Sequence, residues 1–261
     1  MVEGVDRLLL NGVLANTINP YLEPGLPFGY LRGTKVLRDS AGNVLINPAT
    51  GGMIVAPEEG FIGDPSPNYK LGITNTFSYK NFQLSVLVDI TKGGVLYSET
   101  VNSLLGRGVT EDTKDRLTTW IIPGVYGDPN TGLPILGNGK EIQNHTAITT
   151  NDLYFSPDPN NGATLAFNSA SEFEIFDATV YRLREITLAY DFPKSMFKKL
   201  PIASLTLSVT GRNLWFLAPG FPKYTHFDPE VNSFGATTTQ GIELSTAPTT
   251  RRYGLNLNVT F

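Results

Sequence analysis

The sequence has no cysteine and only two histidines among its 261 residues. The absence of cysteine excludes disulfides, thiolate metal sites and a cysteine nucleophile. Charge is also sparse, because Asp, Glu, Lys and Arg make up 17% of the chain, and 20 basic against 24 acidic residues give a net charge of -4. Without a basic excess to neutralise phosphates, nucleic acid is not an expected partner.

Long apolar runs are missing as well. The N-terminal stretch MVEGVDRLLLNGVLANT carries acidic residues early and only a short apolar run, unlike an export signal. No stretch approaches the roughly 18 uninterrupted apolar residues that a membrane-spanning helix needs. With 26 Gly and 18 Pro, the composition also disfavours helical bundles. We therefore expect neither an export signal nor a helical anchor in this sequence, whereas a membrane protein built from strands stays open.

Five segments alternate apolar and polar residues with a period of two, which is typical of strands. The clearest is the end of the chain, where Tyr253, Leu255, Leu257, Val259 and Phe261 share one face. The other four segments are Leu71–Tyr79, Phe82–Ile90, Ile186–Phe192 and Ala203–Thr210. Residues 180–185, VYRLRE, lie directly before Ile186 and break the alternation of that segment, which predicts a bulge.

The connections between these segments are unequal in length. Lys80 and Asn81 predict a tight hairpin, and the link from Pro193 to Pro201 is short. In contrast, residues 91–177 and 215–250 are long and rich in Gly, Pro, Asn, Asp and Thr. Short turns at one end and long loops at the other are typical of outer-membrane barrels.

The charges favour a membrane sheet over a water-exposed one. Within the five alternating segments only Asp89 and Asp191 are charged, and both lie on the polar face. A sheet in water usually carries Lys and Glu on its outer face, whereas an ionised group facing lipid costs about 2–4 kcal/mol at mid-membrane. We therefore expect the apolar face to contact lipid and the Ser, Thr and Asn face to line a wet lumen.

Aromatic residues cluster at the expected strand ends. The group beside the short turns or the chain end is Tyr79, Phe82, Tyr190, Phe192 and Phe261. Tyr253 and Trp215 lie at the opposite ends. Eight steps from Tyr253 to Phe261 cover roughly 26 Å at about 3.3 Å each, or near 20 Å vertically at a tilt of about 40°. The pattern predicts aromatic girdles at the two membrane interfaces.

Six motifs in order carry a resemblance to a known family. They are INPATGG from Ile46, GDPSPNYKLGITNTFSYKNFQLSVLVD from Gly63, YRLREITLAYDFP from Tyr181, TGRNLW from Thr210, FDPEVN from Phe227 and RRYGLNLNVTF from Arg251. The final strand, ending in an aromatic residue, resembles the signature that the barrel-assembly machinery reads in outer-membrane proteins. The set as a whole resembles the C-terminal part of SusC/RagA-type TonB-linked outer-membrane proteins.

The resemblance implies an all-β fold, an antiparallel up-and-down meander that forms the C-terminal part of a 22-stranded transmembrane barrel with long extracellular loops. It also implies import of oligosaccharides or peptides across the bacterial outer membrane, a SusD-like surface lipoprotein as partner, and energy from the TonB complex through a plug domain. The sequence shows no plug and only five strands, and five strands cannot close a barrel. We expect the terminal quarter of a transporter.

Two regions follow from this interpretation. Residues 1–68 are expected to be an extracellular loop region with a small hairpin within Gly29–Ile46 and a turn at PGLPFG. Residues 69–261 are expected to be C-terminal barrel strands, with Phe261 and both short links in the periplasm.

Four side chains are candidate ligand-facing residues. Trp120, Tyr126 and Tyr154, with the adjacent Phe155, could stack on sugar rings, although packing of the long loop on itself is the alternative. Arg212, like Arg182 and Arg184, could donate to a polar solute in the lumen; the alternative is an ion pair with Glu185 or neighbouring strands.

The sequence offers little support for a catalytic site or a cofactor site. His145 and His226 lie among polar loop residues, and GNGK at Gly137–Lys140 lacks the spacing of a phosphate loop. We expect no cofactor, with loop calcium as a minor hypothesis: alternate oxygens at Asp228, Glu230 and Asn232, or at Asp158 and Asn160, suit a hard cation, but ordinary Asx turns explain them as well.

Two other classes remain as alternatives. A secreted β-sandwich that binds carbohydrate would show the same alternation, and a glycoside hydrolase would need a distinguished pair of carboxylates that the sequence does not present. We expect no enzyme activity.

Overall fold

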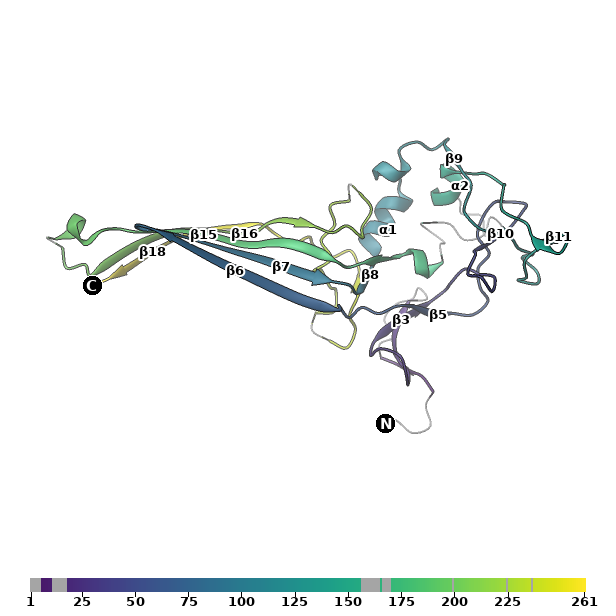
Figure 1. The fold of residues 1–261 in the computed structure, drawn as a ribbon, viewed down its shortest axis with the longest axis horizontal. Coiled ribbons are helices and arrows are strands. Elements are labelled where there is room, and N and C mark those ends of the chain that lie inside the picture. Colours follow the sequence, from purple (N-terminus) through teal and green to yellow (C-terminus); the bar gives the residue numbers. More distant parts are fainter. Residues whose placement is uncertain are drawn as a thin grey trace.

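The computed structural model describes residues 6–10, 18–155, 165, 170–198, 200–223, 225–235 and 237–261. Figure 1 shows an elongated molecule, with a long sheet at one end and a body of short strands, helices and loops at the other. The C-terminus lies at the far tip of the sheet and the N-terminus beside the loop body (Figure 1).

The long sheet has five strands in the order β18-β16-β15-β7-β6, each antiparallel to its neighbours. They are β6 (Tyr69–Tyr79), β7 (Phe82–Lys92), β15 (Val180–Asp191), β16 (Ser204–Leu217) and β18 (Arg252–Thr260). All five predicted strands and the meander are confirmed, and β16 runs further than the alternation indicated. The sheet is open among the described residues, with β6 and β18 at its edges.

The predicted turn and bulge are both present. Tyr79 pairs directly with Phe82, so Lys80 and Asn81 form a two-residue turn, and Lys80 adopts a φ of 53° as hairpin turns of this length require. The register of β15 shifts between Leu183 and Glu185 against both neighbouring strands. Against β7, Arg184 is the extra residue of a bulge, because two steps along β15 oppose one step from Val88 to Leu87, and this explains the broken alternation in VYRLRE. Against β16 the extra residue lies on β16, between Trp215 and Arg212, where Asn213 adopts a φ of 52°.

The loop body contains short elements that the alternation did not predict. Its strands are β1 (Leu8–Leu9), β2 (Asn19–Leu22), β3 (Tyr30–Gly33), β4 (Leu45–Ile46), β5 (Gly60–Gly63), β8 (Val95–Ser98), β9 (Thr119–Trp120), β10 (Val125–Tyr126), β11 (Leu136–Gly137), β12 (Lys140–Glu141), β13 (Ile148–Thr149), β14 (Ile175–Asp177) and β17 (Ile242–Glu243). Among the residues that the structure describes, short 3-10 helices span Glu111–Thr113, Ser171–Phe173 and Lys194–Phe197.

The described residues also contain two short helices in the loop body, within a fold that is otherwise built of strands as expected. These helices are α1 (Glu99–Gly106) and α2 (Thr150–Phe155). Helix α1 forms because Ser98 caps it, accepting a hydrogen bond from the backbone N–H of Val101, and because Val101 and Leu105, four residues apart, are both buried. Neither helix is long or apolar enough to cross a bilayer, and this holds for every helix in the described part of the chain.

The N-terminal region forms a small antiparallel sheet, β1-β2-β3-β5. PGLPFG joins β2 to β3, as the predicted turn. The predicted hairpin is shorter than Gly29–Ile46: the backbone N–H of Leu45 donates to the carbonyl of Leu37, and Asp39 and Asn43 close the turn. Strand β3 instead pairs with β2 and β5. How this region is placed relative to a membrane stays a prediction.

The hydrophobic core lies in the loop body. Four clusters of buried side chains are centred on Val36 and Ile46, on Leu96 and Val101, on Leu31 and Ile242, and on Leu45 and Val125. The large apolar side chains along the five long strands are not part of these clusters. The two ends of the molecule are therefore stabilised differently.

Candidate functional site

The apolar side chains of the five strands form one continuous face. Register places Ile73 opposite Val88, and Leu188 opposite both Leu84 and Val209. Leu207 pairs with Tyr190 on one side and Leu257 on the other. Much of this face is open, with Phe77 62% and Leu255 75% exposed. An exposed apolar surface of this extent on one side of a sheet indicates that this side contacts an apolar partner or an apolar medium.

Aromatic side chains group at the tip of the sheet, where the short turns lie. Tyr79 pairs with Phe82, which pairs with Tyr190. The ring centroids of Phe82 and Tyr190 are 4.7 Å apart, and those of Tyr190 and Phe192 are 4.9 Å apart. Phe261 is 84% exposed at the same end. The predicted clustering of aromatic residues at the strand ends is present.

The opposite face carries hydroxyls, amides and paired charges. The hydroxyls of Thr187 and Thr210 are 2.9 Å apart, and Thr206 donates to the carboxylate of Asp191. The guanidinium of Arg212 donates to the carboxylate of Glu185 over 2.8 Å. Because polar groups on this face pair across strands, they stabilise the register of the sheet.

At the loop end of the polar face, two arginines of β15 form ion pairs with acidic residues of the loop that follows β16. Arg182 is completely buried and makes a bidentate pair with Asp228, in which Nη1 donates to Oδ2 over 2.7 Å. Arg184, placed by the bulge, donates to Glu230 over 2.8 and 2.6 Å and to Asp89. Bidentate geometry of this kind is strong and orients both partners.

The environment of Asp228 keeps its carboxylate ionised. Burial by itself raises the pKa of Asp228, but hydrogen bonds from Arg182 and from the hydroxyl of Thr249 outweigh that effect and hold the pKa below its ordinary value. Without Asp228, the buried charge of Arg182 would keep only the longer contact of 3.4 Å with the partly exposed Glu230. The pair therefore fixes the loop to the sheet.

A cavity of about 290 Å³ lies where this loop covers the polar face. The sheet contributes Lys70, Asp89 and Arg184 to its lining, and the loop contributes Glu230 and Asn232. Charges of both signs therefore surround the cavity, whereas further along the strands the polar face consists mostly of Ser, Thr and Asn with a few paired charges. This charged cavity is the candidate functional site.

A second buried carboxylate anchors the same loop to α1. Glu243 is fully buried and accepts hydrogen bonds from the hydroxyls of Ser98 and Thr100, each over 2.7 Å, and from the backbone N–H of Thr246. Burial raises the pKa of Glu243, but these donors outweigh it and lower the pKa overall. Its position beside the first turn of α1 also suits the helix dipole.

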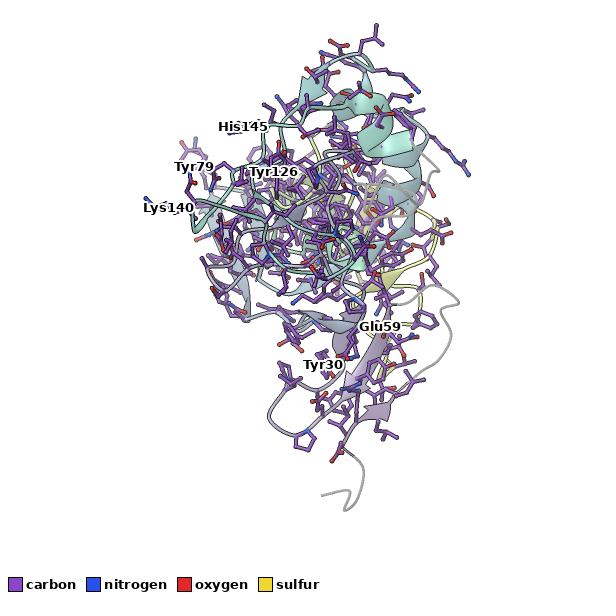
Figure 2. All side chains as sticks on the ribbon, turned by 90° about the vertical axis from the view of Figure 1, so that its right-hand side faces the viewer. Tyr30, Glu59, Tyr79, Tyr126, Lys140 and His145 are labelled. Atoms are coloured by element: carbon purple, nitrogen blue, oxygen red, sulfur yellow. The ribbon has the colours of Figure 1, made fainter. Side chains whose placement is uncertain are left out.

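The predicted ligand-facing residues are dispersed. Trp120 is 49% exposed, and its indole N–H donates to Thr150. The hydroxyl of Tyr126 lies 3.0 Å from that of Thr146 and accepts from the backbone N–H of His145, its neighbour in Figure 2. Tyr154 packs against the cluster around Leu96 and Val101. Arg212 pairs with Glu185, the alternative that the sequence left open. Ligand contact by these four residues stays a prediction.

The acidic loop residues proposed for calcium are engaged by arginine. Asp228 and Glu230 bind Arg182 and Arg184, and Asn232 donates to the carbonyl of Gly235. In the described part of the chain no group of three or more His, Asp or Glu side chains is arranged to hold a metal. Asp158 and Asn160 lie outside the described residues.

The charged cavity was missed from the sequence, although a signal was present. Arg182 and Arg184 are two residues apart, and so are Asp228 and Glu230. Two basic and two acidic residues with equal spacing can pair when their segments lie side by side. From the sequence alone, the acids were candidates for calcium binding and the arginines for the lumen, and no periodicity connected the two sets.

Comparison with known proteins identifies relatives of the chain. No protein-family profile matches it. TonB-dependent receptor P3 of Formosa agariphila is 24% identical over 228 residues, 85% of this chain and 19% of the relative. TonB-dependent receptor P26 of the same organism is 28% identical over 224 residues, 80% of this chain and 18% of the relative. The chain thus spans less than a fifth of the length of these curated relatives.

Solved structures agree on the fold. The RagAB peptide importer in its open-open state matches with a TM-score of 0.57 at 15% identity, over 100% of this chain and 25% of that chain. The structure of the RagAB peptide transporter matches with the same TM-score at 16% identity, over the same shares. At this identity the likeness establishes the fold of the chain.

The chain is therefore similar in sequence to part of two TonB-dependent receptors and similar in fold to a quarter of the RagAB importer chain. The resemblance that the six motifs predicted is confirmed.

Proposed function

We propose that β6, β7, β15, β16 and β18 are C-terminal strands of the 22-stranded barrel of a TonB-dependent transporter that imports oligosaccharides or peptides. The observation that carries this proposal is the continuous apolar face, which no second sheet covers in the described part of the chain. In a bilayer the same side chains contact acyl chains, and the polar face looks into the lumen.

The open edges support the same proposal. β6 and β18 each leave a row of backbone groups unpaired on one side, and in lipid each such group costs several kcal/mol. Further strands of the transporter would satisfy these groups and close the barrel. The long loops at the other end then face the cell exterior, where residues 1–68 contribute to the mouth and a SusD-like lipoprotein is the proposed partner.

Three other partners follow from this function. Outer-membrane lipid surrounds the apolar face, and the TonB complex supplies energy through a plug domain. The barrel-assembly machinery recognises the last strand, whose inward- and outward-facing residues alternate up to Phe261. In this arrangement Trp120 is the most exposed of the predicted aromatic residues and the best placed of them to contact a solute at the mouth.

Single-cysteine spin labelling tests the proposal directly, because the sequence has no native cysteine. Leu257→Cys places a label on the apolar face of β18, and the neighbouring Asn256→Cys is the matched control on the polar face. In the receptor embedded in outer membrane, we expect the label at residue 257 to collide mainly with oxygen dissolved in lipid. The label at residue 256 should collide mainly with a water-soluble nickel complex.

The alternative of a secreted β-sandwich gives a different result. In a sandwich the label at residue 257 would be buried under a second sheet and reached by neither relaxing agent. That outcome, or recovery of the folded protein in the soluble fraction without detergent, would refute the barrel function.

A further inference from the structure

Residues 225–235, which we call the strap, cross the loop end of the polar face. Packing holds both ends of the strap. At one end, the rings of Phe227 and Phe221 stack with centroids 5.0 Å apart. At the other end, the backbone N–H of Ser233 donates to the carbonyl of Ile242 over 3.0 Å, and Phe234 packs on the cluster that contains Ile242. The strap is therefore tied down on both sides of its acidic residues.

The middle of the strap is bound to the sheet by two close ion pairs of different exposure, and a longer contact of 3.4 Å joins Arg182 to Glu230. The side chains of Arg182 and Asp228 are 2% and 4% exposed. Those of Arg184 and Glu230 are 28% and 42% exposed. The first pair has almost no exposed surface, although Arg182 belongs to the lining of the cavity, and it holds the strap in place. The second pair is open to the lumen side, so that a solute passing along the polar face meets it.

The charged cavity is the space left under the strap. Thr91 and Arg184 line it from the sheet, and Glu230 and Asn232 line it from the strap. Its volume of about 290 Å³ is at the lower limit for a small-molecule site. Any solute that reaches this part of the polar face has to pass between the strap and the strands.

We propose that the strap is a fixed constriction that limits the size of solutes reaching the polar face beneath it, with Glu230 and Arg184 setting the width of the opening. Arg182 and Asp228 are positioning residues that hold the strap. The inference rests on the proposed function, since it takes the polar face as the wall of a solute path. It assigns to this one loop a role in selectivity by size.

The test measures access to a cysteine under the strap in the complete receptor, in outer membrane. Thr91→Cys places a thiol in the cavity lining. The comparison site is Arg252→Cys, which lies on the polar face of β18 outside the lining of the cavity. Each is reacted with a small water-soluble thiol reagent and with a bulky one, and the ratio of the two rates is recorded. Glu230→Ala then opens the strap, and Glu230→Gln, which keeps the volume of the side chain, is its control.

We expect Glu230→Ala to raise the bulky-to-small ratio at residue 91 several-fold and to leave the ratio at residue 252 unchanged. Glu230→Gln should change the ratio at residue 91 much less. The inference is overturned if Glu230→Ala leaves the ratio at residue 91 unchanged, or raises it equally at both sites. Failure of the proposed function looks different: the folded protein would then be recovered in the soluble fraction without detergent, or a label at residue 257 would be reached by neither relaxing agent.

Discussion

The buried pair of Arg182 and Asp228 gives the sharpest prediction. Asp228→Asn keeps the size of the side chain but leaves the buried guanidinium of Arg182 with only the partly exposed Glu230, 3.4 Å away, as a counter-charge. Breaking a buried pair in this way costs about 3–5 kcal/mol. Because Asp228 lies in the strap and not in the five long strands, we expect the cost to appear as local opening of the strap, with the sheet intact.

Amide hydrogen exchange of the full receptor measures this opening. The reporter is the backbone N–H of Ser233, which donates to Ile242 and does not contact Asp228. At about tenfold per 1.4 kcal/mol, the protection of this amide should fall by roughly a hundredfold to a few thousandfold, or to no protection at all. Exchange in β16 should not change.

Two further variants make the result decisive. Glu111→Gln removes an exposed carboxylate that pairs with Lys114, and such surface pairs contribute about 0–1 kcal/mol, so the strap should not respond. Replacing both members of the buried pair, Arg182→Met with Asp228→Leu, should restore much of the protection, because no charge is left unpaired. Unchanged exchange at Ser233 in Asp228→Asn would refute the conclusion that this pair holds the strap.

Further predictions concern the lipid face, the helix cap, acid and close packing. Leu257→Arg should cost about 2–4 kcal/mol and reduce the folded receptor in outer membrane, whereas Asn256→Arg should be tolerated, as measured by heat-modifiable mobility in gels. Glu243→Gln should cost about 1–3 kcal/mol, because it replaces a carboxylate that only accepts hydrogen bonds with an amide whose N–H groups need acceptors. The loss should be detected as faster amide hydrogen exchange in α1. Because the pKa of Asp228 is lowered in the folded protein, its contribution to the stability of the strap is fully present above the ordinary Asp pKa of about 3.9. That contribution is lost as pH falls through the pKa of Asp228 in the folded protein. Amide protection of the strap, corrected for intrinsic exchange rates, should therefore stay constant from neutral pH to about 5 and fall at lower pH. Gly220→Ala should destabilise the loop body, since an added Cβ would lie 2.3 Å from the carbonyl oxygen of Asp177, and unchanged thermal stability would contradict this.

The strands of the sheet were predictable because their information is local. Alternation with a period of two identifies a strand and its faces without knowledge of its neighbours. The structure confirms this for all five long strands. The bulge was predictable for the same reason, since two consecutive polar residues, Arg184 and Glu185, separate Leu183 from Ile186. The helices were not predicted, because α1 is short and its burial depends on contacts such as that of Glu243, far along the chain.

The contacts of the loops could not be derived in the same way. Arg182 and Asp228 are 46 positions apart, and Ser98 and Glu243 are 145 apart. No periodicity connects segments at such separations, and the acids of the strap could have bound a cation, formed Asx turns or met the arginines. The equal spacing of the two pairs was a hint, but it does not specify that the two segments meet.

By itself, the amino-acid sequence determined which side chains share the apolar and polar faces, because a strand places successive residues on opposite sides. The tertiary structure decided that the loop after β16 folds back over the polar face, that its carboxylates pair with the arginines of β15, and that a cavity remains beneath it. These features depend on the path of a loop through space, and the path is set by distant packing around Phe221, Phe227 and Ile242.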